Sequence, residues 1–360
     1  MSRRCSLYAA VLLVACTFAS GQLMPVAATS PTTSTLPAAT SNTAYDPHFN
    51  VGRGYWKRDY LVYVHSASPS VDLYDRNSLR LTVTAQIPGA EETSLTDAAV
   101  AKTGELIVSG SAKLKSGEYR RFVALADHNG QVSRLVDTGG YAPTRVTTCD
   151  GITAWTLGWE RTPAGTELKE SYAVLRQYRL SDGALLSSDL DRTSFPRWPS
   201  PALSALHQFP DLTLQCRGNV VGIYEGATDE WIEYDAAERK LTRWKLPTRN
   251  HPWVQSDAQG RILPNEGEAT FITGVAMLDS GEVYASFRYH PEAKVWNETV
   301  QVGLFRLHKD GDSGTWVPVG GTQGNLWQEG GFDTLRGTDG TNLVYSRFKQ
   351  PGWFFSPPPR

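Results

Sequence analysis

The sequence predicts an all-β fold, a β-propeller of six blades with four antiparallel strands in each. A short phrase recurs five times, in which apolar or small residues, a polar turn that ends in Gly, and further apolar residues follow one another. The turn glycines are separated by 47, 67, 63 and 59 residues, which is a suitable length for one blade. Helical periodicity is absent, whereas Gly, Pro and aromatic residues are abundant. The turn glycines are Gly104, Gly151, Gly218, Gly281 and Gly340.

We interpret each phrase as the hairpin of the two inner strands of a blade. Apolar segments suited to two outer strands follow it, and three of these pairs are joined by Asn-Gly or Asp-Gly, which favour hairpin turns because their residues tolerate positive φ. The expected outer strands are residues 121–125 and 132–136, 174–180 and 184–188, 231–234 and 240–246, and 302–307 and 315–319.

The two ends of the repeat region are incomplete, and their assignment decides the number of blades. The front supplies residues 60–64, 71–74 and 79–85 without a clear inner strand, and the back supplies 332–335, 343–348 and 353–355. Separate blades at the two ends make six, with residues 49–55 as the missing inner strand. One blade completed from both termini would make five, an arrangement that hides sheet edges equally well.

Two phrases of the repeat resemble those of the bacterial six-bladed propellers of the broad NHL/TolB-like group. They are Val71-Asp72-Leu73-Tyr74-Asp75 and Asp279-Ser280-Gly281-Glu282-Val283-Tyr284, and the resemblance covers about residues 45–355. It implies the fold and leaves the activity open, because propellers serve as binding platforms, lyases, glycosidases and lactonases alike.

The N-terminal region has the layout of a secretory signal peptide. Arg3 and Arg4 precede an apolar run over residues 7–18 that is too short to span a bilayer. We expect residues 1–21 to be removed; alternatively, Leu13-Val14-Ala15-Cys16 is a lipobox, with cleavage before Cys16 and lipidation of its thiol. Residues 22–44 form a Ser/Thr/Pro/Ala leader that cannot bury a core, and residues 45–360 form the propeller domain. The predicted location is secreted or periplasmic, or else a membrane-anchored lipoprotein.

Net charge, hydropathy and missing motifs exclude several classes of partner and site. The formal net charge of −2 becomes −4 once Arg3 and Arg4 are removed, so no nucleic-acid partner is expected. No second apolar segment is long enough for a transmembrane span. Phosphate-binding, nucleophile-elbow and paired-His zinc motifs are missing, so the sequence predicts no cofactor and no metal. We expect a monomer.

Two cysteines remain in the exported part, and each lies two residues before the turn Gly of its repeat. Cys149 and Cys216 therefore occupy equivalent positions in consecutive blades. In an oxidising compartment they are a disulfide candidate, provided that their Cα atoms lie within about 7 Å; otherwise they are free thiols.

Seven residues before each turn Gly, four of the five repeats carry a polar residue. The positions are Asp97, Thr144 (followed by Arg145), Asp211, Gly274 and Asp333. At the start of inner strands they would form a ring at one mouth of the channel. Asp97, Asp211 and Asp333, with Arg145 alongside, would there bind a cation or a polar ligand. The alternative is that each Asp bonds backbone N–H groups as the chain enters its strand.

The long connections between blades should emerge at that same mouth. They carry Trp198, His207, Trp253 and Trp327, and exposed indoles offer sugars or apolar ligands a rigid face. Alternatively, these Trp residues pack the loops onto the blades.

The sequence as a whole favours a binding platform for a protein or glycan partner. The second interpretation is a hydrolase or lyase that acts on carbohydrate or a small ester at the channel mouth.

Overall fold

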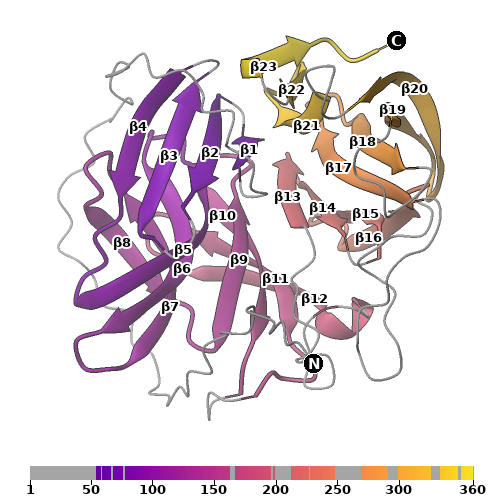
Figure 1. Ribbon diagram of the computed structural model, residues 1–360. Helices are drawn as coiled ribbons and strands as arrows, with labels where there is room; N and C mark the ends of the chain where they lie inside the picture. Colours follow the sequence, from indigo (N-terminus) through magenta and orange to yellow (C-terminus); the bar gives the residue numbers. More distant parts are fainter. Residues whose placement is uncertain are drawn as a thin grey trace, which may run out of the picture.

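Small antiparallel sheets arranged around a central axis make up the described part of the chain (Figure 1). The computed structural model describes residues 54–57, 59–65, 68–75, 78–162, 167–195, 198, 212–226, 228–247, 269–290, 299–325, 333–347 and 350–359. Apart from one short 3-10 helix, η1 (Arg192–Ser194), the regular elements within those ranges are strands.

The strands group into six blades along the chain. Blade 1 contains β1 (Gly54–Lys57), β2 (Tyr60–Val64), β3 (Ser70–Asp75) and β4 (Ser78–Thr84), blade 2 contains β5 (Ala90–Val100), β6 (Leu106–Leu114), β7 (Tyr119–Ala126) and β8 (Val132–Asp137), and blade 3 contains β9 (Tyr141–Thr147), β10 (Thr153–Glu160), β11 (Ala173–Arg179) and β12 (Leu185–Asp191). Blade 4 contains β13 (Leu212–Arg217), β14 (Val220–Glu225), β15 (Glu230–Asp235) and β16 (Lys240–Lys245), blade 5 contains β17 (Ala269–Met277), β18 (Val283–His290), β19 (Thr299–Asp310) and β20 (Ser313–Asn325), and blade 6 contains β21 (Asp333–Thr338), β22 (Leu343–Arg347) and β23 (Gln350–Ser356).

The predicted six-bladed propeller is confirmed, and the five-blade alternative is wrong. The two chain ends form separate blades that are joined at their innermost strands, where β1 pairs in parallel with β21 at Trp56–Gly337 and Lys57–Thr338. This pairing unites blades 6 and 1 into one sheet of order β23-β22-β21-β1-β2-β3-β4 and closes the ring. The missing inner strand begins at Gly54, so it overlaps the expected segment 49–55 only at its end.

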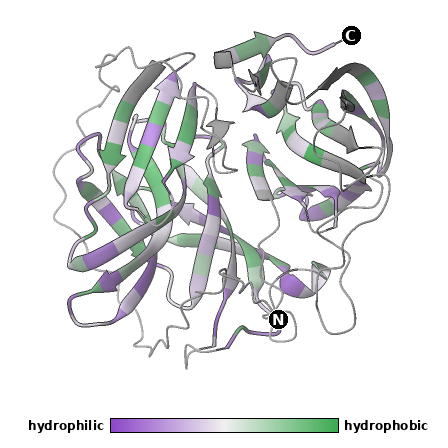
Figure 2. Ribbon diagram, in the orientation of Figure 1, coloured by the Kyte–Doolittle hydropathy of each residue, from purple (hydrophilic) through white to green (hydrophobic). Residues whose placement is uncertain are grey.

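The turn glycines end the inner strands as predicted. All five have positive φ, between 54° and 98°, a region that Gly enters without the steric penalty of a Cβ. The two strands of each hairpin then run antiparallel, and because the β backbone is pleated, successive side chains lie on opposite faces of the blade. In Figure 2 hydrophobic and hydrophilic residues accordingly interchange along many strands.

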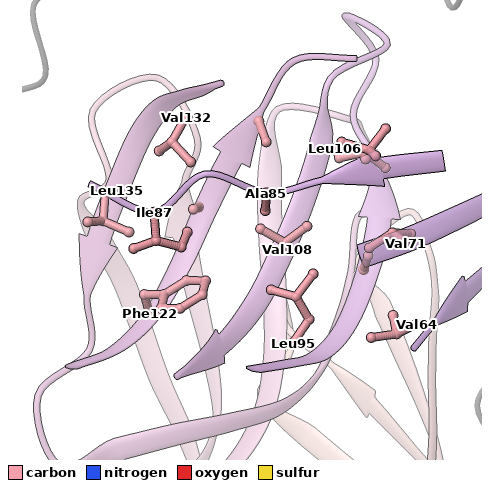
Figure 3. Close-up of a cluster of buried hydrophobic side chains, with 14 of the residues drawn as sticks. Val64, Val71, Ala85, Ile87, Leu95, Leu106, Val108, Phe122, Val132 and Leu135 are labelled. Carbon is pink, nitrogen blue, oxygen red and sulfur yellow. The ribbon is translucent and has the colours of Figure 1, made fainter. Parts of the chain in front are cut away.

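The core lies between neighbouring blades. Figure 3 shows the cluster between blades 1 and 2, in which Val64 and Val71 of blade 1 face Leu95, Val108 and Phe122 of blade 2. Each of these five side chains is at most 1% exposed. Similar clusters fill the other seams, so each blade buries its faces against the blades on either side.

The expectations for the N-terminal region concern residues outside those described. The signal peptide at 1–21, the lipobox at Cys16 and the leader at 22–44 all fall there. Within the described ranges, no helix has the length and apolar character needed to cross a membrane.

Candidate functional site

A cavity of about 650 Å³ lies at the end of the channel where the inner hairpins turn. All six blades contribute to its wall, because each sends the end of its innermost strand or the following turn to this place. The lining consists of Lys57, Asp59 and Tyr60 from blade 1, residues 99–104 from blade 2, 147–151 from blade 3, 214–216 from blade 4, Met277 and Asp279 from blade 5, and Thr338 and Gly340 from blade 6.

Neighbouring turns around the cavity interlock through their glycines. The backbone N–H of Lys102 donates to the carbonyl of Gly151 in the next blade, and that of Asp279 donates to Gly340. A Cβ at Gly151 would lie 2.3 Å from the Cβ of Lys102, and one at Gly340 would lie 2.4 Å from a carboxylate oxygen of Asp279. Positive φ favours Gly at both turns, and at Gly151 the close approach of the Lys102 backbone requires it as well.

Lys57 forms the floor of the cavity and ties three blades together. Its ammonium lies 2.9 and 3.0 Å from the two carboxylate oxygens of Asp97, and it donates to the carbonyls of Ala98 at 2.6 Å and Val146 at 2.8 Å. Asp97 also accepts the backbone N–H of Val146 at 2.9 Å. Burial lowers the pKa of Lys57 below its ordinary value, although the Asp97 carboxylate opposes the shift. With its protons directed at protein acceptors, this ammonium is a structural group.

Gln215 plays the corresponding part between blades 4 and 5. Its side-chain amide donates to the carbonyl of Val275 at 2.7 Å and accepts the backbone N–H of Met277 at 2.8 Å. One side chain of β13 thereby extends the backbone hydrogen bonding of β17, which holds the two innermost strands in register.

A disulfide closes the seam between blades 3 and 4. Cys149 and Cys216 are bonded, with their Cα atoms 5.2 Å apart, and both line the cavity. The equivalent positions that suggested the pairing do face each other across adjacent blades. The distance lies within the range that a disulfide spans.

Charged side chains of both signs surround the opening. Lys102, Asp59, Asp150 and Asp279 are exposed there. Partial burial alone would raise the pKa of Asp150, but hydrogen bonds from the backbone N–H groups of Thr153 and Ile152 outweigh it and hold that pKa below its ordinary value. Asp150 therefore remains ionised near neutral pH. Within the described ranges, no three His, Cys, Asp or Glu side chains meet in a way that would hold a metal ion.

The two described members of the predicted ring of carboxylates, Asp97 and Asp333, do not occupy equivalent positions. Asp97 pairs with Ser109, twelve residues on, whereas Asp333 pairs with Arg347, fourteen residues on. An equal distance from the turn Gly thus places them at different points of their hairpins, and a β-bulge between Asp333 and its turn also changes the register in blade 6. Asp97 is 5% exposed inside β5 and bonds Lys57 and Val146, so it neither faces a ligand nor caps its own strand. The ligand-site expectation is therefore wrong for Asp97, whereas the expected bond to a backbone N–H is present but reaches the neighbouring blade instead of the start of its own strand.

Of the remaining predicted site residues, some belong to the described part of the chain and others lie outside it. Arg145 lies close enough to Lys57 to contribute to the lowering of its pKa, and its guanidinium donates to the carbonyl of Thr144 at 2.8 Å. Trp198 is 1% exposed, and its indole N–H donates to the carbonyl of Gly158, so it packs its loop instead of presenting a face. Asp211, His207, Trp253 and Trp327 lie outside the described residues, and Asp333 is the first residue of β21.

Sequence reasoning placed the site at the mouth where the long connections emerge and missed the cavity at the hairpin turns. Lys57 was missed because its strand is only four residues long and lacks a turn Gly. The signal that would have found the cavity is the set of turn glycines itself. Turns that end the innermost strands of all blades must gather at one end of the channel.

Comparison with known proteins identifies no family. No family profile and no curated protein matches the chain. Solved structures similar to it include one described as an exported protein from Bacteroides fragilis (TM-score 0.44, 10% identity, 86% of this chain and 82% of that one). A second is described as a 6-phosphogluconolactonase from Bacteroides uniformis (TM-score 0.35, 12% identity, 80% of this chain and 89% of that one). A third is a GH43_1 enzyme from Xanthomonas citri (TM-score 0.33, 12% identity, 78% of this chain and 93% of that one). TM-scores this low carry no argument about activity.

Proposed function

We propose that the protein is an exported binding platform whose cavity at the hairpin-turn end of the channel receives a polar group of a protein or glycan partner. The observation that carries the proposal is the cavity itself, to which all six blades contribute. Its volume of about 650 Å³ falls within the range of roughly 300–1,000 Å³ that is usual for ligand sites.

Rigidity of the wall supports binding. The turns are joined by the Gly151 and Gly340 contacts, by the Lys57 and Gln215 side chains, and by the disulfide. A ligand that enters such a site does not have to order the chain around it, so less of the interaction free energy is lost on binding.

The chemistry of the opening suits a polar ligand. Exposed Lys102, Asp150 and Asp279 offer both a cationic donor and anionic acceptors. Hydroxyl groups of a sugar and the amide groups of a peptide both match such a lining, because each carries donors and acceptors.

The pKa of Asp150 bears on the second interpretation, glycoside hydrolysis. A glycosidase needs a carboxyl group that donates a proton near neutral pH. Asp150 has a lowered pKa and stays ionised. This carboxylate is therefore not suited to the role of general acid.

The test is a binding screen of the exported chain on an oligosaccharide array and a peptide array, followed by calorimetry of each ligand found. Lys102→Glu reverses a charge at the cavity opening and should weaken binding by about tenfold. Lys115→Glu makes the same charge change at an exposed turn of blade 2 outside the cavity lining and should leave binding unchanged.

Equal effects of the two variants would place the ligand elsewhere and refute the proposed site. Incubation with chromogenic glycosides and esters tests the second interpretation. Turnover of any of them that Lys102→Glu reduces and Lys115→Glu does not would overturn the binding-platform proposal in favour of an enzyme.

A further inference from the structure

The disulfide lies where the cavity wall meets the hydrophobic cluster between blades 3 and 4. Cys149 follows the end of β9 by two residues, and Cys216 lies in β13. Both residues are half-buried, and both line the cavity. A small thiol reagent in the cavity can therefore reach this bond without opening a blade.

The crosslink joins two groups of blades that are held together internally by other means. Blades 1, 2 and 3 are tied by Lys57, which bonds Asp97 and Val146. Blades 4, 5 and 6 are tied by Gln215 and by the backbone bond from Asp279 to Gly340. At this end of the channel, the disulfide is the covalent junction between the two groups.

Farther from the axis, the same seam is held by apolar packing. Leu157 and Trp198 from blade 3 share a cluster with Val221 and Ile223 from blade 4, and each is at most 1% exposed. Arg243 of blade 4 also donates to the carbonyl of Ser194 at 2.6 Å. Cys149 and Cys216 pack against the edge of this cluster, but its buried members contact one another directly, so we expect them to keep the blades together when the disulfide is cleaved.

We propose that the Cys149–Cys216 disulfide is a site of thiol–disulfide exchange through which a dithiol reductant opens the cavity between blades 3 and 4. A thiolate of the reductant attacks one sulfur, forms a mixed disulfide and releases the other Cys as a thiolate. The second thiolate of the reductant then attacks its own sulfur in the mixed disulfide and releases the second Cys. The protein gains two electrons and two protons, and the dithiol becomes a disulfide.

Reduction releases the turn that carries Cys149 from the end of β13, where Cys216 lies next to the following turn, and the cavity loses part of its rigid wall. The consequence for ligand affinity rests on the proposed function, because it assumes that the ligand binds there. A partner that needs the closed wall binds the oxidised protein more tightly.

The experiment measures accessibility and local opening without a ligand. The exported chain is incubated with dithiothreitol in native buffer, free thiols are alkylated with N-ethylmaleimide, and the peptides that contain Cys149 and Cys216 are quantified by mass spectrometry. We expect reduction at a rate within about tenfold of that of glutathione disulfide under the same conditions. Hydrogen exchange of residues 148–152 and 217–219 should become at least about tenfold faster after reduction, while residues 115–118 remain unchanged.

Two comparisons make the result decisive. The double variant Cys149→Ser/Cys216→Ser should show the fast exchange of the reduced protein with or without dithiothreitol. Reduction only at the rate of global unfolding, global unfolding of the reduced protein, or unchanged exchange of residues 148–152 and 217–219 would each overturn the proposal.

For a ligand that the screen has placed in the cavity, reduction should raise Kd by about tenfold. An unchanged Kd with faster exchange would refute the coupling alone, whereas a ligand outside the cavity would refute the proposed function and leave the exchange site standing.

Discussion

Removal of the carboxylate beneath the cavity should destabilise the propeller strongly. Asp97→Ala leaves the Lys57 ammonium without its counter-ion and the N–H of Val146 without its acceptor. The side chains of Lys57 and Asp97 are only 14% and 7% exposed, so water cannot replace the lost contacts fully. Breaking a buried ion pair on one side costs about 3–5 kcal/mol, and we expect a loss of that size in the free energy of unfolding.

The reverse change and the double change separate the charge effect from the packing effect. Lys57→Met leaves a buried carboxylate with the Val146 N–H and should cost about 3–4 kcal/mol. In Lys57→Met/Asp97→Ala no buried charge remains, so the loss should be about 2–3 kcal/mol smaller than the sum of the single losses.

The assay is urea unfolding followed by Trp fluorescence, with the free energy of unfolding obtained by linear extrapolation. The matched control is Lys113→Met, whose ammonium lies 3.9 Å from Glu91 and 3.8 Å from Glu92 on the surface. That variant should change stability by less than about 1 kcal/mol, because exposed pairs are screened by water. Additive single losses, or a loss below about 1 kcal/mol for Asp97→Ala, would refute the structural role given to Lys57.

Three further outcomes are expected. Burial raises the pKa of Tyr234 to about 12, with a neighbouring aspartate adding to the shift, so the folded protein holds the phenolic proton while the unfolded chain loses it near pH 10. This contribution to stability is present below pH 10 and is lost as pH rises to about 12. The free energy of unfolding of Tyr234→Phe should therefore depend less on pH between 10 and 12 than that of the unchanged protein. Identical pH profiles of the two proteins would contradict the raised pKa of Tyr234. Gly274→Ala should lower stability by about 1–3 kcal/mol, because its Cβ would lie 2.0 Å from the carbonyl oxygen of Leu335; an unchanged thermal midpoint would show that blades 5 and 6 are not so close. Loss of the Cys149–Cys216 bond should cost about 4 kcal/mol in the loop-entropy treatment, measured as the unfolding difference with and without reductant, and no difference would mean that the crosslink does not constrain the unfolded chain.

Short sequence patterns were sufficient to predict the strands and hairpins of the blades. Alternation of apolar residues identifies a strand within a few positions, and a Gly after a polar turn marks a hairpin, because both depend on backbone geometry close in sequence. The cysteine pairing followed from the same regularity, since equal offsets from Gly151 and Gly218 gave Cys149 and Cys216 equivalent places in adjacent blades.

An equal distance from the turn Gly did not predict equivalent positions for the carboxylates. Asp97 and Asp333 stand the same distance before their turn glycines, yet their pairing partners differ because the turns and bulges of the two hairpins differ. Side-chain direction changes with every single-residue shift in a strand, so a small irregularity removes the equivalence. Trp198 was assigned to a ligand face by residue type alone, whereas its burial depends on the surface of blade 3 beneath its loop.

Strand positions and turn glycines were contained in the amino-acid order, because each rests on contacts between residues near one another in the chain, whereas the choice between five and six blades was decided by the pairing of the two chain ends. Ring closure through β1 and β21, the Lys57 node and the cavity between the turns were decided only in three dimensions. Each depends on residues far apart in the sequence, with Lys57 and Val146 separated by 89 positions. Such contacts exist only once all six blades have packed, and no periodicity along the chain specifies which of them will meet.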